Sequence, residues 1–331
     1  MPPKITIITP SYNQGQFIEE TILSVIGQDY PNLEYIIIDG GSTDDTVDII
    51  KKYEKHITYW VSEKDTGQSN AINKGLKIAS GDIINWLNSD DVLMPGSLAL
   101  IVQKFNEHPD AIMVHGRIQY FGASNYYSRN LSKKDIETRY AAHICMPQPA
   151  CFFKKKLIDE QGLLDETLHF SMDTDLYVRA GLHYSIVQVD DIFAKFRLHN
   201  SSKSVSVFNK TFLADNKLIF SRVLHTLSAF NEISELKKLN LFVEPEYAYN
   251  KTGKTFDTHK LLFYFLEHRL LTIHSHGDKK TFKTIFSYLF RKYNVETFSS
   301  NKLLLYRFSL FLPSSFLHAL ARLRYRSKAG N

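Results

Sequence analysis

Two adjacent carboxylates follow an apolar, strand-like run in residues 86–91, which read Trp-Leu-Asn-Ser-Asp-Asp. Acidic side chains at the end of a buried strand are poor core material. Hard cations such as Mg²⁺ and Mn²⁺, however, bind carboxylate oxygens and leave other positions for phosphate and water. The cluster therefore indicates metal-assisted chemistry on a diphosphate. An acidic turn before a helix that begins near Pro95 explains it equally well, so the rest of the chain must decide between the two.

The first two hundred residues alternate between strand-like and helix-like patterns. Apolar residues recur at helical spacing after the first strand, and a helix is predicted over residues 69–79. Ser42 or Thr43 is predicted to cap the helix that follows the second strand. Strands that alternate with helices predict an α/β fold with a doubly wound, mostly parallel sheet. The predicted strands are residues 5–9, 34–39, 57–62, 83–87 and 111–115.

Polar residues follow four of these strands at the point where each strand ends. Ligands of doubly wound sheets bind outside the carboxyl ends of the strands, so these residues are expected to share one site. Polar loops are common and account for one or two such ends, but less readily for all four. The residues are Ser11, Tyr12 and Asn13, then Asp39, then Glu63 and Asp65, then residues 88–91.

Taken together, the motifs resemble those of glycosyltransferase family 2, whose members have the GT-A fold. The resemblance covers roughly residues 4–205 and implies a Rossmann-like, nucleotide-sugar-binding and catalytic domain over residues 1–205. Each element is weak alone, but seven in family order are a strong signal. They are residues 8–13, 38–44, 62–67 with 71–75, 88–91, 147–149, 172–176 with Arg179, and 197–201.

The resemblance assigns Asp39 to the nucleotide base, where a carboxylate accepts a hydrogen bond from the imide N–H of uracil or thymine. A turn before the next helix is the alternative role for Asp39. Tyr12 is expected to pack against the base, although an aromatic residue here also suits the core. The other nucleotide-binding residues that the resemblance implies are Pro10, Ser11, Asp65, Asn73, Asn88 and Ser89.

Residues 88–90 occupy the place of the family's D-x-D motif, with Asn88 at its first position. An amide still hydrogen-bonds a hydroxyl, but one negative charge is lost, so weaker metal affinity is expected. The resemblance makes Asp90 a ligand of Mn²⁺ or Mg²⁺. Asp91 is either a second ligand or a structural acid that holds the loop. His199 matches a histidine that reaches the metal or the diphosphate in similar enzymes.

Asp173 matches the family's general base, which takes the proton of an acceptor hydroxyl as that oxygen attacks the anomeric carbon. Asp175 is the alternative base, although helical spacing points it away from Asp173. Compensation of the helix dipole explains either carboxylate without catalysis.

Long helical patterns replace the strand alternation from residue 206, so a mainly helical C-terminal region is predicted over residues 206–331. After Glu296 the chain has six basic residues and no acidic one. Basic residues interleaved with large apolar ones favour binding to an anionic membrane surface. Packing on the protein and dimerisation are the alternatives. Nucleic acid is not an expected partner, because no recognition motif accompanies the basic residues.

The formal net charge of the chain is only +5, and its two cysteines cannot build a disulfide framework. No signal peptide and no apolar run of about 18 residues is present, which predicts a cytoplasmic protein, peripheral at most at the inner face of the cell membrane.

The predicted function is that of a metal-dependent, inverting glycosyltransferase that moves a sugar from a nucleotide-diphosphate donor to a glycan or lipid-linked hydroxyl. UDP-sugars are the favoured donors, and polysaccharide biosynthesis is the expected setting. The Gln-x-x-Arg-Trp motif of processive relatives is absent. One alternative is a sugar-nucleotide nucleotidyltransferase, which normally carries a glycine-rich loop where this chain has Pro-Ser-Tyr-Asn. A catalytically inactive GT-A binding protein is the other, left open by Asn88.

Overall fold

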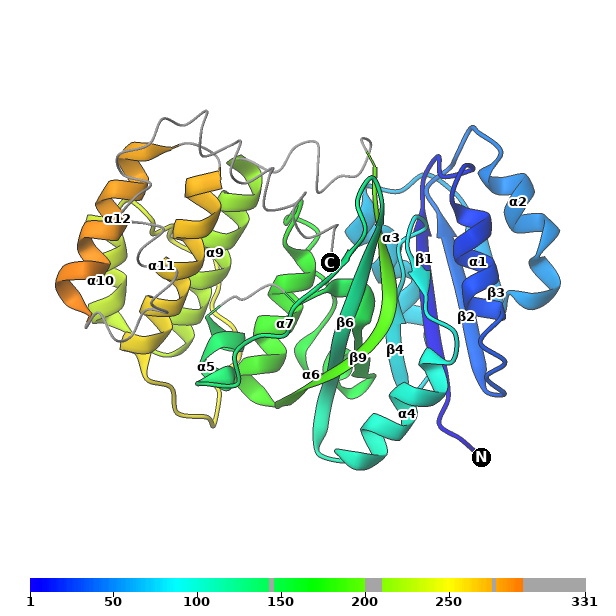
Figure 1. The fold of residues 1–331 in the computed structure, drawn as a ribbon, viewed down its shortest axis with the longest axis horizontal. Helices are drawn as coiled ribbons and strands as arrows, with labels where there is room; N and C mark the ends of the chain where they lie inside the picture. Colours follow the sequence, from blue (N-terminus) through cyan, green and yellow to red (C-terminus); the bar gives the residue numbers. More distant parts are fainter. Residues whose placement is uncertain (143–145, 200–209, 276–277, 294–331) are drawn as a thin grey trace. The chain divides into compact units, whose positions relative to one another are not determined.

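The computed structural model describes residues 1–142, 146–199, 210–275 and 278–293. The chain divides into two compact units (Figure 1). The first comprises residues 1–137 and 145–212, and the second comprises residues 138–144 and 213–331. The predicted boundary at residue 205 lies outside the described residues and stays a prediction.

The first unit is built from alternating strands and helices, as the sequence predicts. Its first half contains β1 (Ile5–Ser11), α1 (Ile18–Ile26), β2 (Leu33–Asp39), α2 (Thr46–Lys52), the 3₁₀ turn η1 (Glu54–His56), β3 (Tyr59–Ser62), α3 (Gln68–Ile78) and β4 (Ile83–Trp86). Its second half contains β5 (Val92–Leu93), α4 (Ser97–Glu107), β6 (Ala111–Gly122), β7 (Tyr126–Tyr127), η2 (Gln148–Ala150), β8 (Cys151–Lys154), α6 (Lys156–Gln161), α7 (Met172–His183) and β9 (Ser185–Leu198). The short helix α5 (Ile136–Ala141) crosses from the first unit into the second.

The strands of the described chain form one sheet in the order β3-β2-β1-β4-β8-β6-β9-β5, with β7 paired to β6. Strands β3, β2, β1 and β4 are mutually parallel, and β6 runs parallel to β9. Strand β8 runs antiparallel to both β4 and β6. The predicted α/β fold is confirmed, and its parallel half carries the carboxyl ends on which the predicted site depends.

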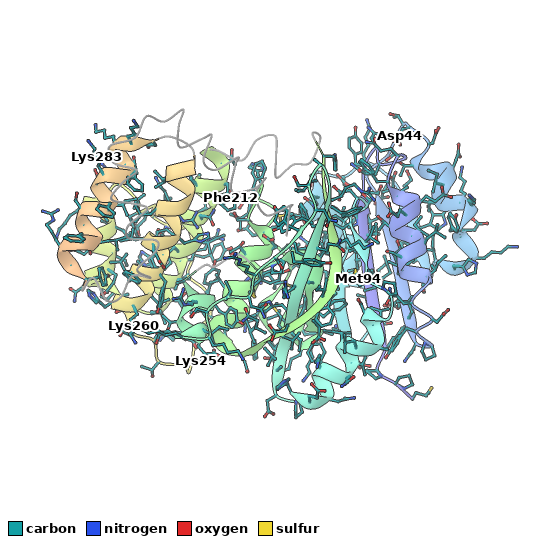
Figure 2. All side chains as sticks on the ribbon, viewed as in Figure 1. Asp44, Met94, Phe212, Lys254, Lys260 and Lys283 are labelled. Carbon is teal, nitrogen blue, oxygen red and sulfur yellow. The ribbon has the colours of Figure 1, made fainter. Side chains whose placement is uncertain are left out.

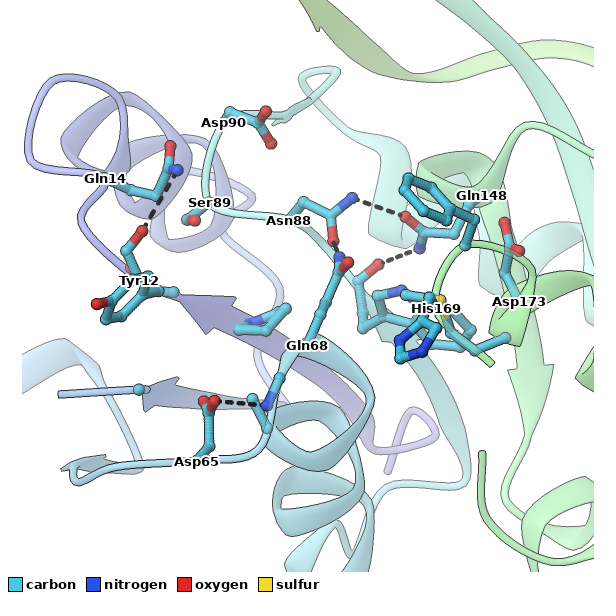
Figure 3. A pocket seen from close by; sticks show the side chains of 18 of the residues that line it. Tyr12, Gln14, Asp65, Gln68, Asn88, Ser89, Asp90, Gln148, His169 and Asp173 are labelled. Atoms are coloured by element: carbon cyan, nitrogen blue, oxygen red, sulfur yellow. Dashed lines mark hydrogen bonds between the residues drawn. The ribbon is translucent and has the colours of Figure 1, made fainter. Parts of the chain in front are cut away.

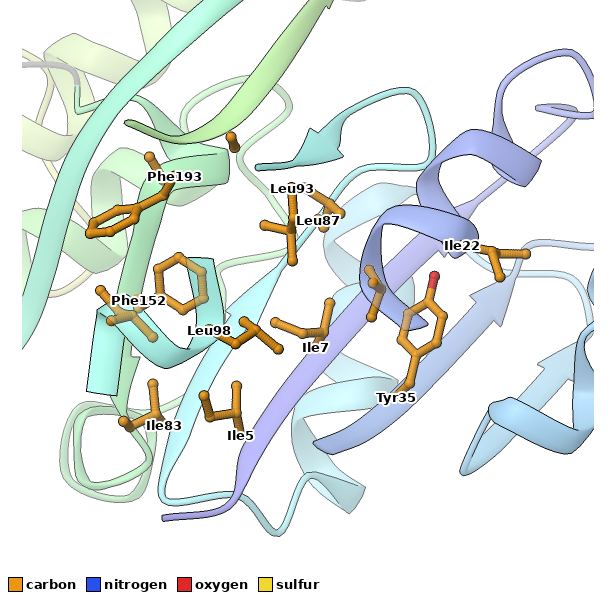
Figure 4. Packing of buried hydrophobic residues seen from close by; sticks show 14 of the residues in the cluster. Ile5, Ile7, Ile22, Tyr35, Ile83, Leu87, Leu93, Leu98, Phe152 and Phe193 are labelled. Atoms are coloured by element: carbon orange, nitrogen blue, oxygen red, sulfur yellow. The ribbon is translucent and has the colours of Figure 1, made fainter. Parts of the chain in front are cut away.

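The core of this unit lies between the sheet and its helices (Figure 4). Ile5 and Ile7 of β1 pack in one cluster with Ile22 of α1 and Leu98 of α4. On α3, Gly75 allows a close approach, because a Cβ there would lie 2.5 Å from a side-chain carbon of Ile8. Every residue of β1 is buried, as expected for a parallel strand covered on both faces.

The predicted cap of α2 is wrong. The helix begins at Thr46, and Asp45 precedes it without a side-chain cap. The Ser42 hydroxyl instead donates to Asp39 over 2.5 Å. The Ser42 hydroxyl therefore binds the buried Asp39 carboxylate at the end of β2 and does not cap α2.

The second unit is helical, as predicted. Stacking of Phe220 on Phe265, with ring centroids 3.9 Å apart, marks its core. Lys260 and Lys283 are exposed on the surfaces of two of its helices (Figure 2). No described helix is long and apolar enough to cross a membrane. The helices are α9 (Lys210–Thr226), α10 (Phe230–Lys238), α11 (Thr258–Ser275) and α12 (Lys279–Lys292). The basic tail, residues 297–331, lies outside the described residues.

Candidate active site

A cleft of about 680 Å³ lies in the first unit, where the parallel strands end. It brings together nine of the residues predicted from the sequence, along with glycines and aromatic side chains. Figure 3 labels Tyr12, Asp65, Asn88, Ser89, Asp90 and Asp173 among them. Four predicted residues are not among those that line it: Asp39, Asn73, Asp91 and Asp175. The nine are Pro10, Ser11, Tyr12, Asp65, Asn88, Ser89, Asp90, Asp173 and His199.

The end of β1 supplies one wall of the cleft. Tyr12 is 60% exposed, so its ring face is available to a ligand. Ser11 is buried, and its hydroxyl has no hydrogen-bond partner among the described residues. A buried hydroxyl without a partner costs free energy, and a bound ligand would remove that cost.

Asp39 is completely buried behind this wall. Its carboxylate accepts hydrogen bonds from the Ser62 hydroxyl and from the backbone N–H groups of Gly41 and Ser42, at 2.6, 3.1 and 2.9 Å. With the bond from the Ser42 hydroxyl, these contacts fix the loop whose glycines line the cleft. The predicted contact of Asp39 with the nucleotide base stays a prediction.

Asp65 lines the cleft beside that loop. Its carboxylate accepts from the Gly67 N–H over 2.8 Å. A Cβ on Gly40 would lie 2.5 Å from the same carboxylate, so the glycine leaves room for Asp65.

Asn73 lies elsewhere, with 2% of its surface exposed. Its amide donates to the Leu164 carbonyl and to Glu166, and accepts from the Leu164 N–H. The structure does not bring Asn73 into the cleft, because its face of α3 packs on the loop before α7.

Asn88 lies in the floor of the cleft between two glutamines (Figure 3). It accepts a hydrogen bond from Gln68 over 2.8 Å and donates to Gln148 over 3.3 Å. Gln148 in turn donates to the Trp86 carbonyl over 2.6 Å. Asn88 is therefore held from both sides.

Asp90 and His199 meet at the edge of the cleft, with 3.0 Å between the carboxylate and Nε2. The His199 ring packs on Phe17 at 4.6 Å, and Arg197 donates to the Asp90 carbonyl over 3.0 Å. These contacts bring the end of β9 against the loop after β4.

This pair fits a divalent cation bound jointly with a diphosphate. Mg²⁺ in phosphate sites commonly takes one or two protein carboxylates and fills its other positions with phosphate oxygens and water. The described residues contain no group of three or more acidic, histidine or cysteine side chains arranged to hold a metal. Asp90 and His199 are the described side chains that would contact such an ion.

Asp91 lies outside the cleft and is 1% exposed. It accepts from the Arg197 N–H over 3.1 Å. Burial, with the neighbouring charge of Asp90, raises the pKa of Asp91 well above its usual value. Of the two roles that the sequence leaves open, this geometry fits the structural acid that ties the loop to β9.

Asp173 lies in the first turn of α7 and lines the cleft. It accepts from the Thr174 N–H over 2.7 Å. Asp175, two residues on, is 1% exposed and pairs with Arg179 over 2.9 Å. The Arg179 guanidinium also donates to three backbone carbonyls in residues 161–163. Of these two carboxylates, Asp173 lines the cleft and Asp175 does not.

Sequence reasoning gave no site role to several cleft residues, among them Gln68, Gln148, His169 and Phe170. Gln68 begins α3, and Gln148 lies in the Pro-Gln-Pro motif, which the sequence marks without giving the glutamine a role. His169 and Phe170 immediately precede α7. Their place just before the expected base was the available signal for these two.

The family model "Glycosyl transferase family 2" matches residues 6–172. Among relatives, the GalNAc(5)-diNAcBac-PP-undecaprenol beta-1,3-glucosyltransferase of Campylobacter jejuni is 24% identical, over 97% of this chain and 98% of its own. The putative teichuronic acid biosynthesis glycosyltransferase TuaG of Bacillus subtilis is 44% identical over 27% of this chain and 36% of its own.

Two solved structures share the fold. S. aureus TarS 1-349 in complex with UDP-GlcNAc gives a TM-score of 0.58 at 18% identity, over 83% of this chain and 75% of that one. The mannosyltransferase PcManGT of Pyrobaculum calidifontis, in complex with GDP-Man and Mn²⁺, gives 0.54 at 17% identity, over 97% and 86%. Both resemblances concern the fold, which is of the GT-A type. Because the family model spans half of the sequence and the sheet carries the cleft expected of that fold, this chain belongs to glycosyltransferase family 2.

Proposed function

We propose that the protein is a non-processive, inverting glycosyltransferase that uses a divalent cation, Mn²⁺ or Mg²⁺, and a nucleotide-diphosphate sugar. The observation that carries this proposal is that the Asp90–His199 pair and Asp173 line one cleft. The Asp90–His199 pair is suited to a diphosphate with its cation, and Asp173 is suited to an acceptor hydroxyl.

A UDP-sugar is the donor we favour. The exposed ring of Tyr12 offers a stacking face for a base, and Ser11 and Asp65 offer polar atoms beside it. TarS, which shares the fold, binds UDP-GlcNAc, whereas the mannosyltransferase binds GDP-Man. Comparison of UDP-, dTDP- and GDP-sugars therefore measures which nucleotide base the protein prefers.

The acceptor we propose is a hydroxyl on a glycan or a lipid-linked saccharide. The relative from Campylobacter jejuni that matches nearly the whole chain acts, by its name, on an undecaprenol-diphosphate-linked glycan. Near Asp173, His169 and Phe170 line the cleft and offer ring faces on which a sugar can pack.

In the proposed reaction, the acceptor oxygen forms a bond to the anomeric carbon while the bond from that carbon to the diphosphate oxygen breaks. Asp173 takes the hydroxyl proton, because a neutral hydroxyl is a weak nucleophile. Attack opposite the diphosphate inverts the anomeric centre. A bound cation would supply charge stabilisation to the departing diphosphate. Asp90 and His199 would hold the diphosphate end of the donor in place for this step.

The test is incubation of the purified protein with UDP-, dTDP- and GDP-sugars, with Mn²⁺ or with EDTA. Slow release of free UDP and sugar that requires Mn²⁺, accelerated by glycan or lipid-linked acceptors, is the expected result. NMR of the transferred sugar reports whether the anomeric centre inverts. Pyrophosphate-dependent formation of UTP would instead indicate a nucleotidyltransferase. Binding without turnover, with suitable acceptors present, would contradict the proposal.

A further inference from the structure

Three side-chain amides form a continuous chain across the floor of the cleft (Figure 3). Gln68 donates to Asn88, Asn88 donates to Gln148, and Gln148 donates to the carbonyl of Trp86. We call these three side chains the amide ladder. It joins the start of α3, the end of β4 and the turn η2, which are far apart in the sequence.

The Trp86 carbonyl determines the direction of every hydrogen bond in the ladder. A backbone carbonyl only accepts, so the Gln148 amide must turn its nitrogen toward it. The Gln148 oxygen then faces Asn88, which must present its own nitrogen. The Asn88 oxygen is left to face Gln68, which donates to it.

Position 88 must therefore donate on one side and accept on the other. An asparagine does both, whereas an ionised aspartate only accepts. A carboxylate at this position would keep the bond from Gln68 but would face the lone pairs of the Gln148 oxygen. Gln148 cannot relieve this by turning over, because its oxygen would then face the Trp86 carbonyl.

We propose that Gln68 and Gln148 are positioning residues that hold Asn88 in one orientation, and that the amide ladder requires an amide rather than a carboxylate at position 88. Asn88 precedes Asp90 by two residues, and all three ladder residues line the cleft. The ladder thus fixes the floor of the site on which donor and acceptor meet. This inference rests on the proposed function for its catalytic part only.

A double-mutant cycle on stability tests the hydrogen-bond pattern without any substrate. Asn88→Asp should lower the Tm by about 2–4 °C. The control Asn125→Asp introduces the same charge at an exposed residue that only accepts, from Gln119, a bond that an aspartate keeps. It should leave the Tm unchanged.

The second half of the cycle separates the ladder from simple repulsion between a carboxylate at position 88 and the neighbouring acids. Gln148→Met removes the opposing oxygen without adding charge. In the Gln148→Met background, Asn88→Asp should lower the Tm by much less than in the native chain. An equal decrease in Tm in the two backgrounds would overturn the ladder, because the destabilisation would then come only from repulsion between the new carboxylate and the neighbouring acidic residues.

Kinetics test whether Gln148 acts through Asn88. Gln148→Met and Asn88→Ala should each lower kcat/KM for donor turnover about tenfold, equivalent to about 1.4 kcal/mol. The double variant should be no slower than Asn88→Ala. Multiplied losses would mean that Gln148 contacts substrate itself and would overturn its positioning role. A wild-type protein that turns over no donor would contradict the proposed function, while the Tm cycle would still decide the ladder.

Discussion

Asp173 and Asp175 are two residues apart in one helical turn, yet the structure gives them different surroundings. Asp173 lines the cleft, whereas Asp175 is buried against Arg179. We expect Asp173→Asn to keep donor binding and to lower transfer by about 10²–10⁴-fold, because it removes the proton acceptor. Calorimetry and kinetics measure the two effects separately.

Asp175→Asn is the matched control. It should lower stability by about 3 kcal/mol, because Arg179 then stays buried without its counter-charge. Folded Asp175→Asn protein should lose much less turnover than Asp173→Asn. The reverse ranking would make Asp175 the base.

Asp90 is expected to carry most of the dependence on a cation. Asp90→Ala should abolish transfer and most of the Mn²⁺-dependent UDP binding, while the fold stays intact by circular dichroism. Asp48→Ala removes the same charge from an exposed site on α2 and should change neither property. Unchanged turnover in folded Asp90→Ala protein would rule out the role proposed for Asp90.

Sequence analysis located the site residues that belong to short sequence motifs. Asp90, Asp173 and His199 lie in motifs, and the structure brings all three to one cleft. It did not reveal the amide ladder, because Gln68 and Gln148 acquire their roles from contacts between distant segments. The family resemblance also assigned Asn73 to the nucleotide, whereas in the structure its amide donates to the Leu164 carbonyl and to Glu166, a contact that a motif does not reveal.

At the scale of elements, Glu34 of β2 joins its strand to β1 and to the loop between α3 and β4. Its carboxylate accepts from the Ser80 backbone and hydroxyl, from Thr6 and from Lys4. Burial alone would raise the pKa of Glu34, but these hydrogen bonds outweigh it and lower the pKa to about 2. Such a shift corresponds to stability on the order of 3 kcal/mol at neutral pH.

This stability should be complete above about pH 4.5, the ordinary pKa of glutamate, and should be lost as the pH falls toward 2. Glu34→Gln should therefore be less stable than the native protein at pH 7, and the difference should shrink between pH 4.5 and 2. Urea unfolding across this range measures it. Glu54→Gln, at an exposed glutamate, should show no such difference. A stability difference between Glu34→Gln and the native protein that stays constant from pH 7 to pH 2 would contradict the lowered pKa of Glu34.

The predicted strands appear at β1, β2 and β4 because runs rich in isoleucine identify buried strands. The predicted strand at residues 57–62 appears as the shorter β3 (Tyr59–Ser62), whose residues are half-buried or exposed. Strand β8 and the short strands β5 and β7 were not predicted. Strands β8 and β5 pair antiparallel with segments distant in the sequence, as in the pairing of β5 with β9, so no local pattern announces them. Strand β7 pairs antiparallel with the neighbouring β6, but its two residues are too few to form a periodic pattern. The beginning of α2 was wrong for a related reason, since Ser42 found a tertiary partner in Asp39.

At the scale of the whole molecule, the basic tail lies outside the described residues, and its composition alone predicts its role. Residues 297–331 combine six basic residues with large apolar ones and no acid. We expect the protein to sediment with anionic vesicles at low salt and to be released at high salt, because each basic residue near the surface contributes about 1 kcal/mol that salt screens.

Deletion of residues 297–331 should abolish vesicle binding and spare donor hydrolysis, since the described residues that line the cleft all precede residue 200. Replacing Arg322, Arg324 and Arg326 with glutamine keeps the apolar residues and should weaken binding in proportion to charge. Full-length protein that stays in the supernatant at low salt would favour a packing or dimerisation role for the tail.

The position of Trp86 makes ligand binding measurable by fluorescence. The chain contains two tryptophans, and this one is buried in the floor of the cleft, stacked near Tyr177. Indole emission responds to the polarity of its surroundings and to nearby groups that quench it. A nucleotide that enters the cleft changes both, so the native protein carries its own optical reporter of occupancy. With Trp60→Phe, the remaining tryptophan fluorescence comes from Trp86 alone, and unlabelled donors can be ranked by titration.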